Sequence, residues 1–456
     1  MKVLVIGGGI AGLAAARRLV RGGAEVTVLE AADRVGGKLY AGELEGLPLD
    51  LGAESLLARR PEAVGLARDV GLGDALQPVA MGGAAVWTRG ELRPMPRGHV
   101  MGIPGSPEAV AGVVSEEGVE AVRREASLPA EEVGEDVGVG EYVARRFGRE
   151  VVDRLVEPLL GGVYAGDAYR ISLRAAMPAL FDAVREHPTL TEAVHAVQGA
   201  TPAGSGPVFL GIDGGIGRLP LAVADDVRAA GGTVRTGVTV TALRPVDGGW
   251  RALTEDAKYE ADAVVLALPA GPAARLLRVA APDAARELDE VEYASMALVS
   301  MAFRRQEVED VLPAGTGFLV PSVDGRTIKA STFSSRKWDW AGDDELFLLR
   351  TSVGRYGDTA DLEREDGELV DLSLKDLHTA VGLAAKPVAS LVTRWNDGLP
   401  QYAVGHVDRV GRIRAALPAG VVVCGALYDG VGIPAVIASA DRAAAETLGA
   451  PGTMDA

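Results

Sequence analysis

Residues 1–30 contain, in order, a buried strand, a glycine-rich turn, a helix, a second strand and an acidic residue. The apolar run Val3–Ile6 is typical of a strand in a parallel sheet that is covered on both faces. The glycine-rich segment Gly7–Gly12 follows it, and a stretch of helical composition begins at Leu13. The next apolar strand ends at Glu30. This order and spacing predict a βαβ unit that binds a dinucleotide.

Three glycines of the segment have separate physical tasks in such a unit. Gly7 permits the tight turn, Gly9 lets the backbone approach a pyrophosphate, and Gly12 lets the helix pack closely on the strand. The N-terminus of the helix presents free N–H groups and the positive end of its dipole to the phosphates. Glu30, at the tip of the second strand, is placed to bind ribose hydroxyls.

The chain continues past this acid with a second glycine pair and further basic residues. Arg34 precedes Gly36 and Gly37, and Lys38 follows them. More backbone and positive charge after the acid indicate a cofactor longer than NAD. The arrangement resembles the FAD-binding extension of flavoproteins of the glutathione-reductase and amine-oxidase type, so FAD is the expected cofactor.

The composition is that of a globular protein with more than one core. At 456 residues, 48% of them hydrophobic, the chain is expected to form two or three domains. No uninterrupted apolar run reaches the roughly 18 residues of a transmembrane helix. The strand that begins at Val3 leaves no room for a signal peptide, and Cys424 and five scattered histidines show no metal-ligand spacing. We therefore expect a soluble cytoplasmic protein without a metal site.

The charge balance argues against some classes of partner. The chain carries 46 Lys and Arg against 63 Asp and Glu, a formal net charge of −17. Nucleic-acid binding needs a basic face that neutralises phosphates, and electrostatic attachment to anionic lipid needs a basic patch. An anionic substrate would have to be held by a local group of arginines or lysines against the overall field of the protein.

Strand and helix signals alternate along the chain, which indicates an α/β fold, α+β overall. We expect a discontinuous Rossmann-like FAD-binding domain made of residues 1–57, 208–275 and 388–450. It would be interrupted by a mixed-sheet substrate-binding domain and by a helical insert. The expected ranges are 58–106 and 276–387 for the substrate-binding domain, and 107–207 for the helical insert.

Several local expectations follow from the same patterns. Residues 58–100 predict helices and turns, and the alternating residues 238–243 predict a strand. Gly248 and Gly249 indicate the turn of a hairpin. Two buried strands and a final helix are predicted at residues 263–268, 421–424 and 435–448.

Beyond the glycine motifs, the chain resembles the FAD-dependent porphyrinogen oxidases of haem biosynthesis, in particular the coproporphyrinogen III oxidase type of Gram-positive bacteria. The similarity runs from residue 1 to about residue 450. Blocks in the family's order carry it: Gly7–Gly12 with Glu30–Lys38, Leu51–Arg60, Met95–Pro104, Glu157–Asp167, Thr393–Trp395 with Leu399–Tyr402, and Gly425 with Gly430–Pro434.

The resemblance implies roles for individual residues. It places the FAD diphosphate and ribose on the glycine turn and the segment after the first acid, which comprise Gly7, Gly8, Gly9, Ile10, Ala11, Gly12, Glu30, Ala31, Gly37 and Lys38. It places the adenine at the backbone of Val238, and the flavin at Gly52, Ala53, Glu54, Ser55, Trp395, Val431, Gly432 and Ile433. Arg60, and after it Arg59, are implied as cations for the substrate's propionates.

The resemblance also implies the activity. FAD would oxidise coproporphyrinogen III to coproporphyrin III, with O2 giving H2O2, so no catalytic side chain is required; a downstream chelatase is an expected partner. Protoporphyrinogen IX oxidase is an alternative, but residues 83–87 lack the arginine that eukaryotic members carry there. Flavin amine oxidases and carotenoid desaturases share the FAD frame. A non-catalytic module that binds porphyrin is the alternative of a different class.

Overall fold

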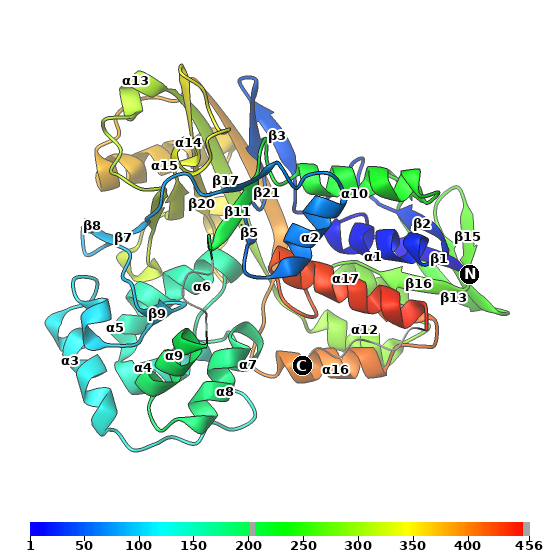
Figure 1. Ribbon diagram of the computed structural model, residues 1–456, viewed down its shortest axis with the longest axis horizontal. Helices are drawn as coiled ribbons and strands as arrows, with labels where there is room; N and C mark the ends of the chain where they lie inside the picture. Colours follow the sequence, from blue (N-terminus) through cyan, green and yellow to red (C-terminus); the bar gives the residue numbers. More distant parts are fainter. Residues whose placement is uncertain (201–205, 450–456) are drawn as a thin grey trace.

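The parallel sheet expected from the N-terminal sequence forms the centre of one half of the computed structural model, which describes residues 1–200 and 206–449. All neighbouring strands in it pair in parallel. The N-terminal strand lies in the middle of the sheet, where both of its edges are hydrogen-bonded. The order across the sheet is β12 (Thr233–Arg235), β2 (Glu25–Leu29), β1 (Lys2–Ile6), β16 (Ala263–Leu266) and β22 (Val421–Val423). Figure 1 labels its strands β1, β2 and β16.

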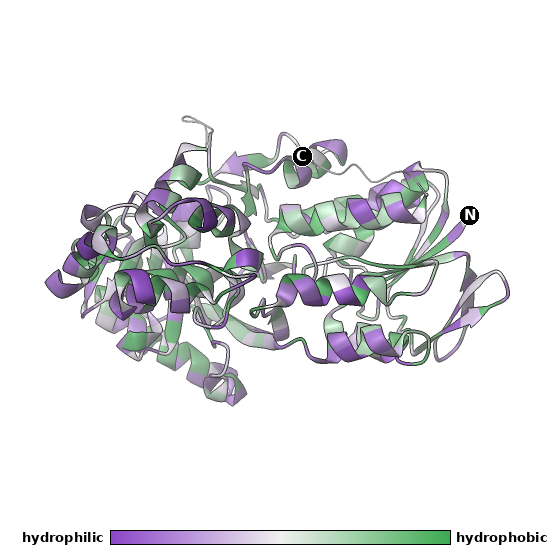
Figure 2. Ribbon diagram, turned by 90° about the horizontal axis from the view of Figure 1, so that it is seen from below, coloured by the Kyte–Doolittle hydropathy of each residue, from purple (hydrophilic) through white to green (hydrophobic). Residues whose placement is uncertain are grey.

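Both faces of this sheet are covered, as its continuously apolar strands require. Val3 and Val5 of β1 face one hydrophobic core, and Leu4 and Ile6 face another. Figure 2 shows that the helices around the sheet carry both hydrophilic and hydrophobic residues. The first core is closed by α1 (Ile10–Arg21), α2 (Pro61–Asp69), α10 (Arg218–Ala229) and α17 (Ile433–Thr447). The second is closed by β13 (Ala242–Val246), β14 (Gly249–Leu253), β15 (Lys258–Ala261), α11 (Ala270–Leu277), α12 (Pro282–Asp289) and α16 (His406–Ala415).

A seven-stranded mixed sheet forms the second large element of the fold. Its strands β18 and β7 pair in parallel, and the other neighbours are antiparallel. One face is covered by α15 (Asp366–Val381), whose Leu369 and Leu377 are buried against it. The order is β21 (Ala389–Pro400), β17 (Tyr293–Arg304), β20 (Leu346–Val353), β19 (Ile328–Thr332), β18 (Gly317–Leu319), β7 (Ala85–Thr88) and β8 (Glu91–Pro94).

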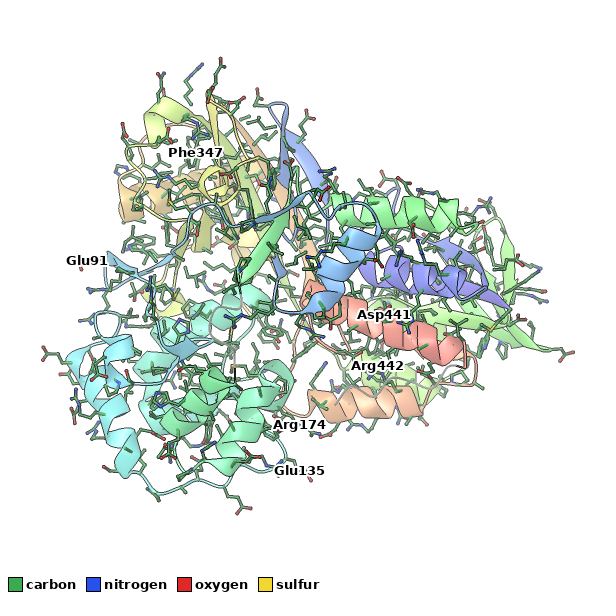
Figure 3. The ribbon with its side chains drawn as sticks, in the orientation of Figure 1. Glu91, Glu135, Arg174, Phe347, Asp441 and Arg442 are labelled. Atoms are coloured by element: carbon green, nitrogen blue, oxygen red, sulfur yellow. The ribbon has the colours of Figure 1, made fainter. Side chains whose placement is uncertain are left out.

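A group of helices with its own core forms the third part of the molecule, at the lower left of Figure 1. Inside it, Glu125 and Arg146 form an ion pair that is almost fully buried. At its border, Arg174 (Figure 3) contacts Asp408 of α16 at 3.0 Å. The elements are α3 (Glu116–Arg124), α4 (Val139–Phe147), α5 (Arg149–Val151), the π-helical η3 (Val152–Val156), α6 (Glu157–Tyr164), α7 (Leu173–Ala176), α8 (Pro178–Glu186) and α9 (Leu190–Gly199).

Small elements connect these three parts. They are the hairpin β3 (Ala41–Leu44) and β4 (Leu47–Asp50), the pair β9 (His99–Val100) and β10 (Ile103–Pro104), the antiparallel sheet of β5 (Leu56–Leu57), β11 (Phe209–Ile212) and β6 (Leu76–Pro78), and the short helices α13 (Arg305–Val308) and α14 (Ser334–Lys337). Within the described residues, no helix is both long enough and apolar enough to cross a membrane.

The fold confirms the predicted mixed α/β class, the hairpin turn at Gly248, and the buried strands and final helix near the predicted positions. The prediction for residues 58–100 was wrong, because strands form there as well as α2. Val86 pairs with Leu319, more than 200 residues later, and such distant pairing overrides local propensity.

The strand predicted at residues 238–243 was also wrong, since pairing starts only at Ala242. The preceding Val238 donates its N–H to the carbonyl oxygen of Glu30 instead, because the chain crosses the end of β2 there. The three-domain division remains a prediction. Sheet pairing joins β11 to β6 as well as to β5, and β21 to β17, although β6 and β17 were expected in the substrate-binding domain and β11 and β21 in the FAD-binding domain. Residues 201–205 and 450, included in the predicted ranges, lie outside the described residues.

Candidate functional site: a dinucleotide cradle between three parts of the fold

The turn between β1 and α1 needs glycine at two positions for steric reasons. Gly7 has a φ of +108°, and a Cβ there would lie 2.4 Å from the carbonyl oxygen of Ala267. A Cβ on Gly12 would lie 1.9 Å from the carbonyl oxygen of Gly7. Neither distance is compatible with a side chain, so helix α1 approaches the turn as closely as only glycine allows.

Gly9 differs from these two, because a Cβ there would meet no heavy atom of the described residues within 4 Å. Helix α1 begins directly after it, and no side chain caps this N-terminus. The N–H groups of Ile10 and Ala11 find no acceptor within the described part of the chain. Free space beside uncapped N–H groups at the positive end of a helix dipole is what a diphosphate requires.

The carboxylate of Glu30 lies at the end of β2 and faces the same turn. Its Oε2 accepts the N–H of Gly8 at 2.6 Å, and its Oε1 accepts that of Ala32 at 2.8 Å. A carboxylate has about four acceptor sites, so two stay open for ribose hydroxyls. Val238 is held against Glu30 by the backbone hydrogen bond at 2.8 Å, and Ala31 is exposed next to them.

The second glycine pair lies against the glycine turn and is followed by Lys38. A Cβ on Gly37 would lie 3.4 Å from the Cα of Gly9. Burial lowers the pKa of Lys38 to about 8, and no carboxylate of the described residues acts against this. A desolvated ammonium group without a counter-ion is unfavourable, so an anionic diphosphate would stabilise it.

Gly52 and Trp395 mark the opposite end of the cradle. A Cβ on Gly52 would lie 2.0 Å from the carbonyl oxygen of Lys38 and 3.3 Å from Cζ2 of Trp395. The indole N–H of Trp395 donates to the carbonyl oxygen of Leu51 at 2.8 Å. The backbone N–H of Ala53 donates to the backbone carbonyl oxygen of Lys38. The fold thus brings Trp395 together with Lys38 and Gly52, and all three were predicted to contact the cofactor.

Glu54 has a structural task that the sequence did not reveal. Its side chain is only 8% exposed and forms ion pairs with Lys337 and, at 3.0 Å, with Arg350. Burial alone would raise the pKa of Glu54, but Arg350 and Lys337 hold it below its ordinary value. Arg350 also donates to the carbonyl oxygen of Gly52 at 3.0 Å. These contacts fix the segment from Gly52 to Ser55 on the seven-stranded sheet.

A second uncapped helix N-terminus lies at the same edge of the parallel sheet. Helix α17 follows β22 as α1 follows β1, and no side chain caps it at Gly432. A Cβ on Gly425, just after β22, would lie 3.8 Å from the Cβ of Ala11, so the end of β22 lies next to the start of α1. Val431 and Ile433 flank Gly432, which places all three on this edge. In such sheets, ligands bind outside the carboxyl ends of the strands.

The loop before α17 is held by several side chains that the sequence did not single out as a group. Tyr402 accepts the N–H of Gly430 at 2.9 Å and donates to the carbonyl oxygen of Ala426. Its ring stacks on His406, with 4.0 Å between centroids. Burial lowers the pKa of His406 to about 4, so its ring is neutral and Nε2 donates to the carbonyl oxygen of Leu427 at 2.8 Å. These contacts position the helix start.

Ion pairs of Asp429 also hold the loop before α17; together with the contacts of Tyr402 and His406 they form a clamp on this loop. Asp429 accepts from Arg442 of α17 (Figure 3) at 2.8 Å and from Arg414 at 2.6 Å. Although burial acts to raise it, the pKa of Asp429 lies below its ordinary value because of these two guanidinium groups.

The predicted substrate arginines lie on a different element. Arg60 is the N-cap of α2, and its Nε lies 3.2 Å from Oε1 of Glu62 on the same helix. Arg59 is exposed. The spacing of Arg60 and Glu62 could have suggested this local pair, and a substrate carboxylate at Arg60 would have to compete with it.

Comparison with known proteins agrees with this geometry. A family model for flavin containing amine oxidoreductases matches residues 10–448. The chain belongs to this family. It is 39% identical to the coproporphyrinogen III oxidase of Mycobacterium leprae over 445 residues, which cover 96% of each chain. It is 32% identical to the coproporphyrinogen III oxidase of Bacillus subtilis, over 98% of this chain and 97% of the relative. A crystal structure from Exiguobacterium sp. 255-15 superposes with a TM-score of 0.87 at 31% identity, over 98% of both chains.

Membership of the family and the dinucleotide turn together identify the cofactor as FAD. The described residues fit such a group, because the space beside Gly9, the unpaired Lys38 and the two uncapped helix N-termini are complementary to a negatively charged dinucleotide. The contacts of single residues with FAD remain predictions.

Exchange of Gly9 for valine tests the phosphate end. The side chain would fill space that is open in the protein itself, so we expect Gly9→Val to fold normally but to be purified without yellow colour. Gly12→Ala is the contrasting variant, because its Cβ clashes with the carbonyl oxygen of Gly7, and we expect it to lower the free energy of unfolding by about 1–3 kcal/mol. Visible absorbance and thermal unfolding of both variants measure this. A yellow Gly9→Val protein would contradict the assignment.

Exchange of Tyr402 for phenylalanine tests the clamp on the loop before α17. The variant loses two hydrogen bonds, each worth about 1 kcal/mol, so the helix start should be less well ordered. We expect the dissociation constant of FAD to rise about tenfold, which corresponds to about 1.4 kcal/mol. Titration of the apoprotein with FAD measures it. The neighbouring Tyr164→Phe serves as the control, and equal effects of both variants would refute a specific role of the Tyr402 hydroxyl.

Proposed function

We propose that this protein is an FAD-dependent oxidase that converts coproporphyrinogen III to coproporphyrin III in haem biosynthesis. The observation that carries the proposal is the extent of the relation to the two coproporphyrinogen III oxidases, which covers 96% or more of every chain involved. A relation of that length includes the helical group and the seven-stranded sheet as well as the dinucleotide turn. Those parts border the cradle and would enclose a substrate between domains.

The reaction explains why the site needs no acid–base triad or metal cluster. FAD, when bound, takes up two electrons at a time from the porphyrinogen and passes them to O2, which gives H2O2. The side chains then have to bind the cofactor, orient the substrate and stabilise charge. The uncapped start of α17 is suited to the last task, because a helix N-terminus stabilises negative charge on the flavin pyrimidine carbonyl.

The four propionates of the substrate require cations, and we propose Arg60 as the first of them and Arg59 as the second. A guanidinium group can bind a carboxylate with two parallel hydrogen bonds. Glu62 contacts that group, which keeps Arg60 oriented at the start of α2. The substrate carboxylate would take the place of Glu62 on binding.

Two other functions are consistent with an FAD-binding fold. Protoporphyrinogen IX oxidase is the nearer one, but the absence of arginine from residues 83–87 argues against it. A porphyrin-binding module without activity is the other, and the steric fit of the glycine turn to a dinucleotide argues against it. O2 as acceptor, a chelatase as recipient of the product, and a cytoplasmic location complete the proposal.

Side-by-side turnover tests the substrate. We expect the purified protein to oxidise coproporphyrinogen III in air faster than protoporphyrinogen IX, as read from porphyrin fluorescence above a control without enzyme. A preference for protoporphyrinogen would favour the nearer alternative. A yellow protein that oxidises neither compound would contradict the proposed function.

Alanine at position 60 tests the anchor. A hydrogen-bonded charge contributes about 1.5–3 kcal/mol, so we expect Arg60→Ala to lower kcat/KM for coproporphyrinogen about tenfold or more, with flavin content unchanged. Arg68→Ala, an exposed arginine on the same helix, is the control. Glu62→Gln should bind substrate at least as well as the unmodified protein, since it frees Arg60. Unchanged kinetics of Arg60→Ala would remove this residue from the site.

A further inference from the structure

Lys329 is a buried lysine whose ammonium group meets no oxygen acceptor within the described residues. Its exposed fraction is 7%, and the ammonium group contacts the Sδ of Met296, 3.9 Å from Nζ. The buried Arg146 and the partly buried Lys337, by contrast, each contact a carboxylate. A buried amine without such a partner is costly in the resting protein, which indicates that it serves a purpose other than stability.

An irregularity in β19 gives this side chain its direction. The pairing of β19 with β20 shifts in register between Ile328 and Ala330, so Lys329 is the extra residue of a bulge. Bulges re-aim side chains and are frequent beside active sites. Ile328 packs into the core under α15, whereas Lys329 reaches Met296.

Met296 connects Lys329 with the flavin end of the cradle. It lies directly opposite Trp395 in the pairing of β17 with β21, next to a second register shift. Directly opposite residues of paired strands point to the same face of a sheet. Trp395 in turn donates to the carbonyl oxygen of Leu51, beside Gly52. Lys329 is therefore on the face of the seven-stranded sheet that borders the cofactor site.

The charged groups that act on Lys329 come from two other elements. Glu157 lies at the start of α6 and Arg355 follows β20, and 3.8 Å separates Oε1 of Glu157 from Nε of Arg355. Glu157 also accepts the N–H of Ser322 at 3.2 Å, and Arg355 donates to the carbonyl oxygen of Val320 at 3.0 Å. Both groups are thus engaged elsewhere, while the amine of Lys329 is not.

The surroundings of Lys329 lower the pKa of its ammonium group. Burial and, to a smaller extent, Arg355 lower its pKa to about 7, although Glu157 acts in the opposite direction. Near neutral pH a substantial fraction of such amines is uncharged and can accept a proton.

We propose that Lys329 faces the bound tetrapyrrole and accepts the proton that the substrate releases as it is oxidised. The inference rests on the proposed function and adds a catalytic residue to it. Its basis is the combination of burial, the bulge, the missing oxygen partner and the position beside Met296 and Trp395.

The step balances as follows for the first oxidation. A C–H bond of a bridging CH2 group breaks, and hydride, with both electrons, leaves for the flavin. The nitrogen lone pair of the adjoining pyrrole joins the new double-bond system. The N–H bond of that pyrrole then breaks, its proton passes to Nζ of Lys329, and its electron pair stays on nitrogen as the new lone pair. Solvent removes the proton from Lys329 before the next oxidation.

Two variants of the holoenzyme separate this role from others. Lys329→Met removes the amine and keeps the length of the side chain, whereas Lys329→Arg keeps a cation that does not give up its proton. Lys375→Met, an exposed lysine on α15, is the control. Three quantities are measured: thermal unfolding, the dissociation constant of coproporphyrin III from fluorescence quenching, and the rate of anaerobic flavin bleaching by coproporphyrinogen III as a function of pH.

We expect both variants to fold and to bind coproporphyrin III as the unmodified protein does. Bleaching should be slower by about 100-fold or more in both, the usual size of a general-base contribution. In the unmodified protein the bleaching rate should rise with pH through about 7, because the uncharged amine is the active form, and this rise should vanish in both variants.

Other results would overturn the inference. Weaker coproporphyrin binding in Lys329→Met that Lys329→Arg restores would make Lys329 an anchor for a carboxylate. A rate without inflection between about pH 6 and 8 in the unmodified protein would exclude a proton acceptor of this kind even if neither variant folds. Failure of the unmodified protein to bleach at all, with Lys375→Met behaving alike, would mean that the proposed function itself is wrong.

Discussion

The close approach of helix α1 to the end of strand β1 is the contact on which the rest of the site depends. It is possible only because Gly12 lies against the carbonyl oxygen of Gly7 without a Cβ between them. This contact fixes where the helix begins, and therefore where its unpaired N–H groups point. The second helix start, at Gly432, is brought to the same edge by the parallel pairing of β22 with β16. A dinucleotide between the two starts would accept from N–H donors that have no acceptor among the described residues.

Two buried carboxylates of the molecule are paired with basic side chains. Glu54 joins Lys337 and Arg350, and thereby ties the segment after β4 to the seven-stranded sheet. Glu125 and Arg146 neutralise each other inside the helical group. Lys38 and Lys329 depart from this pattern, because burial lowers the pKa of both and neither has a carboxylate contact among the described residues. Lys38 follows the glycine pair beside the turn, and we propose that Lys329 faces the substrate; ligands would supply the missing charge or proton.

The sequence predicted what depends on short-range order. The strand, turn, helix and second strand around Gly9 follow one another within 30 residues, and each is determined by local periodicity and by glycine. Contacts across long separations were not predictable in this way. Lys337 comes 283 residues after Glu54, and nothing in the sequence around either residue indicates the other. The bulge at Lys329 depends on the pairing of β19 with β20. The alternating residues 238–243 have the pattern of a strand, but Val238 donates its N–H to the carbonyl oxygen of Glu30 instead of to a partner strand.

Release of the cofactor from the purified protein is the most direct test of the account. The protein is denatured in the dark, and the liberated flavin is identified and quantified by chromatography against FAD and FMN standards. The cradle has free space beside Gly9 and two uncapped helix N-termini that suit a dinucleotide, so we predict one FAD per chain. FMN alone, or a folded protein that neither contains flavin nor takes up added FAD, would contradict it.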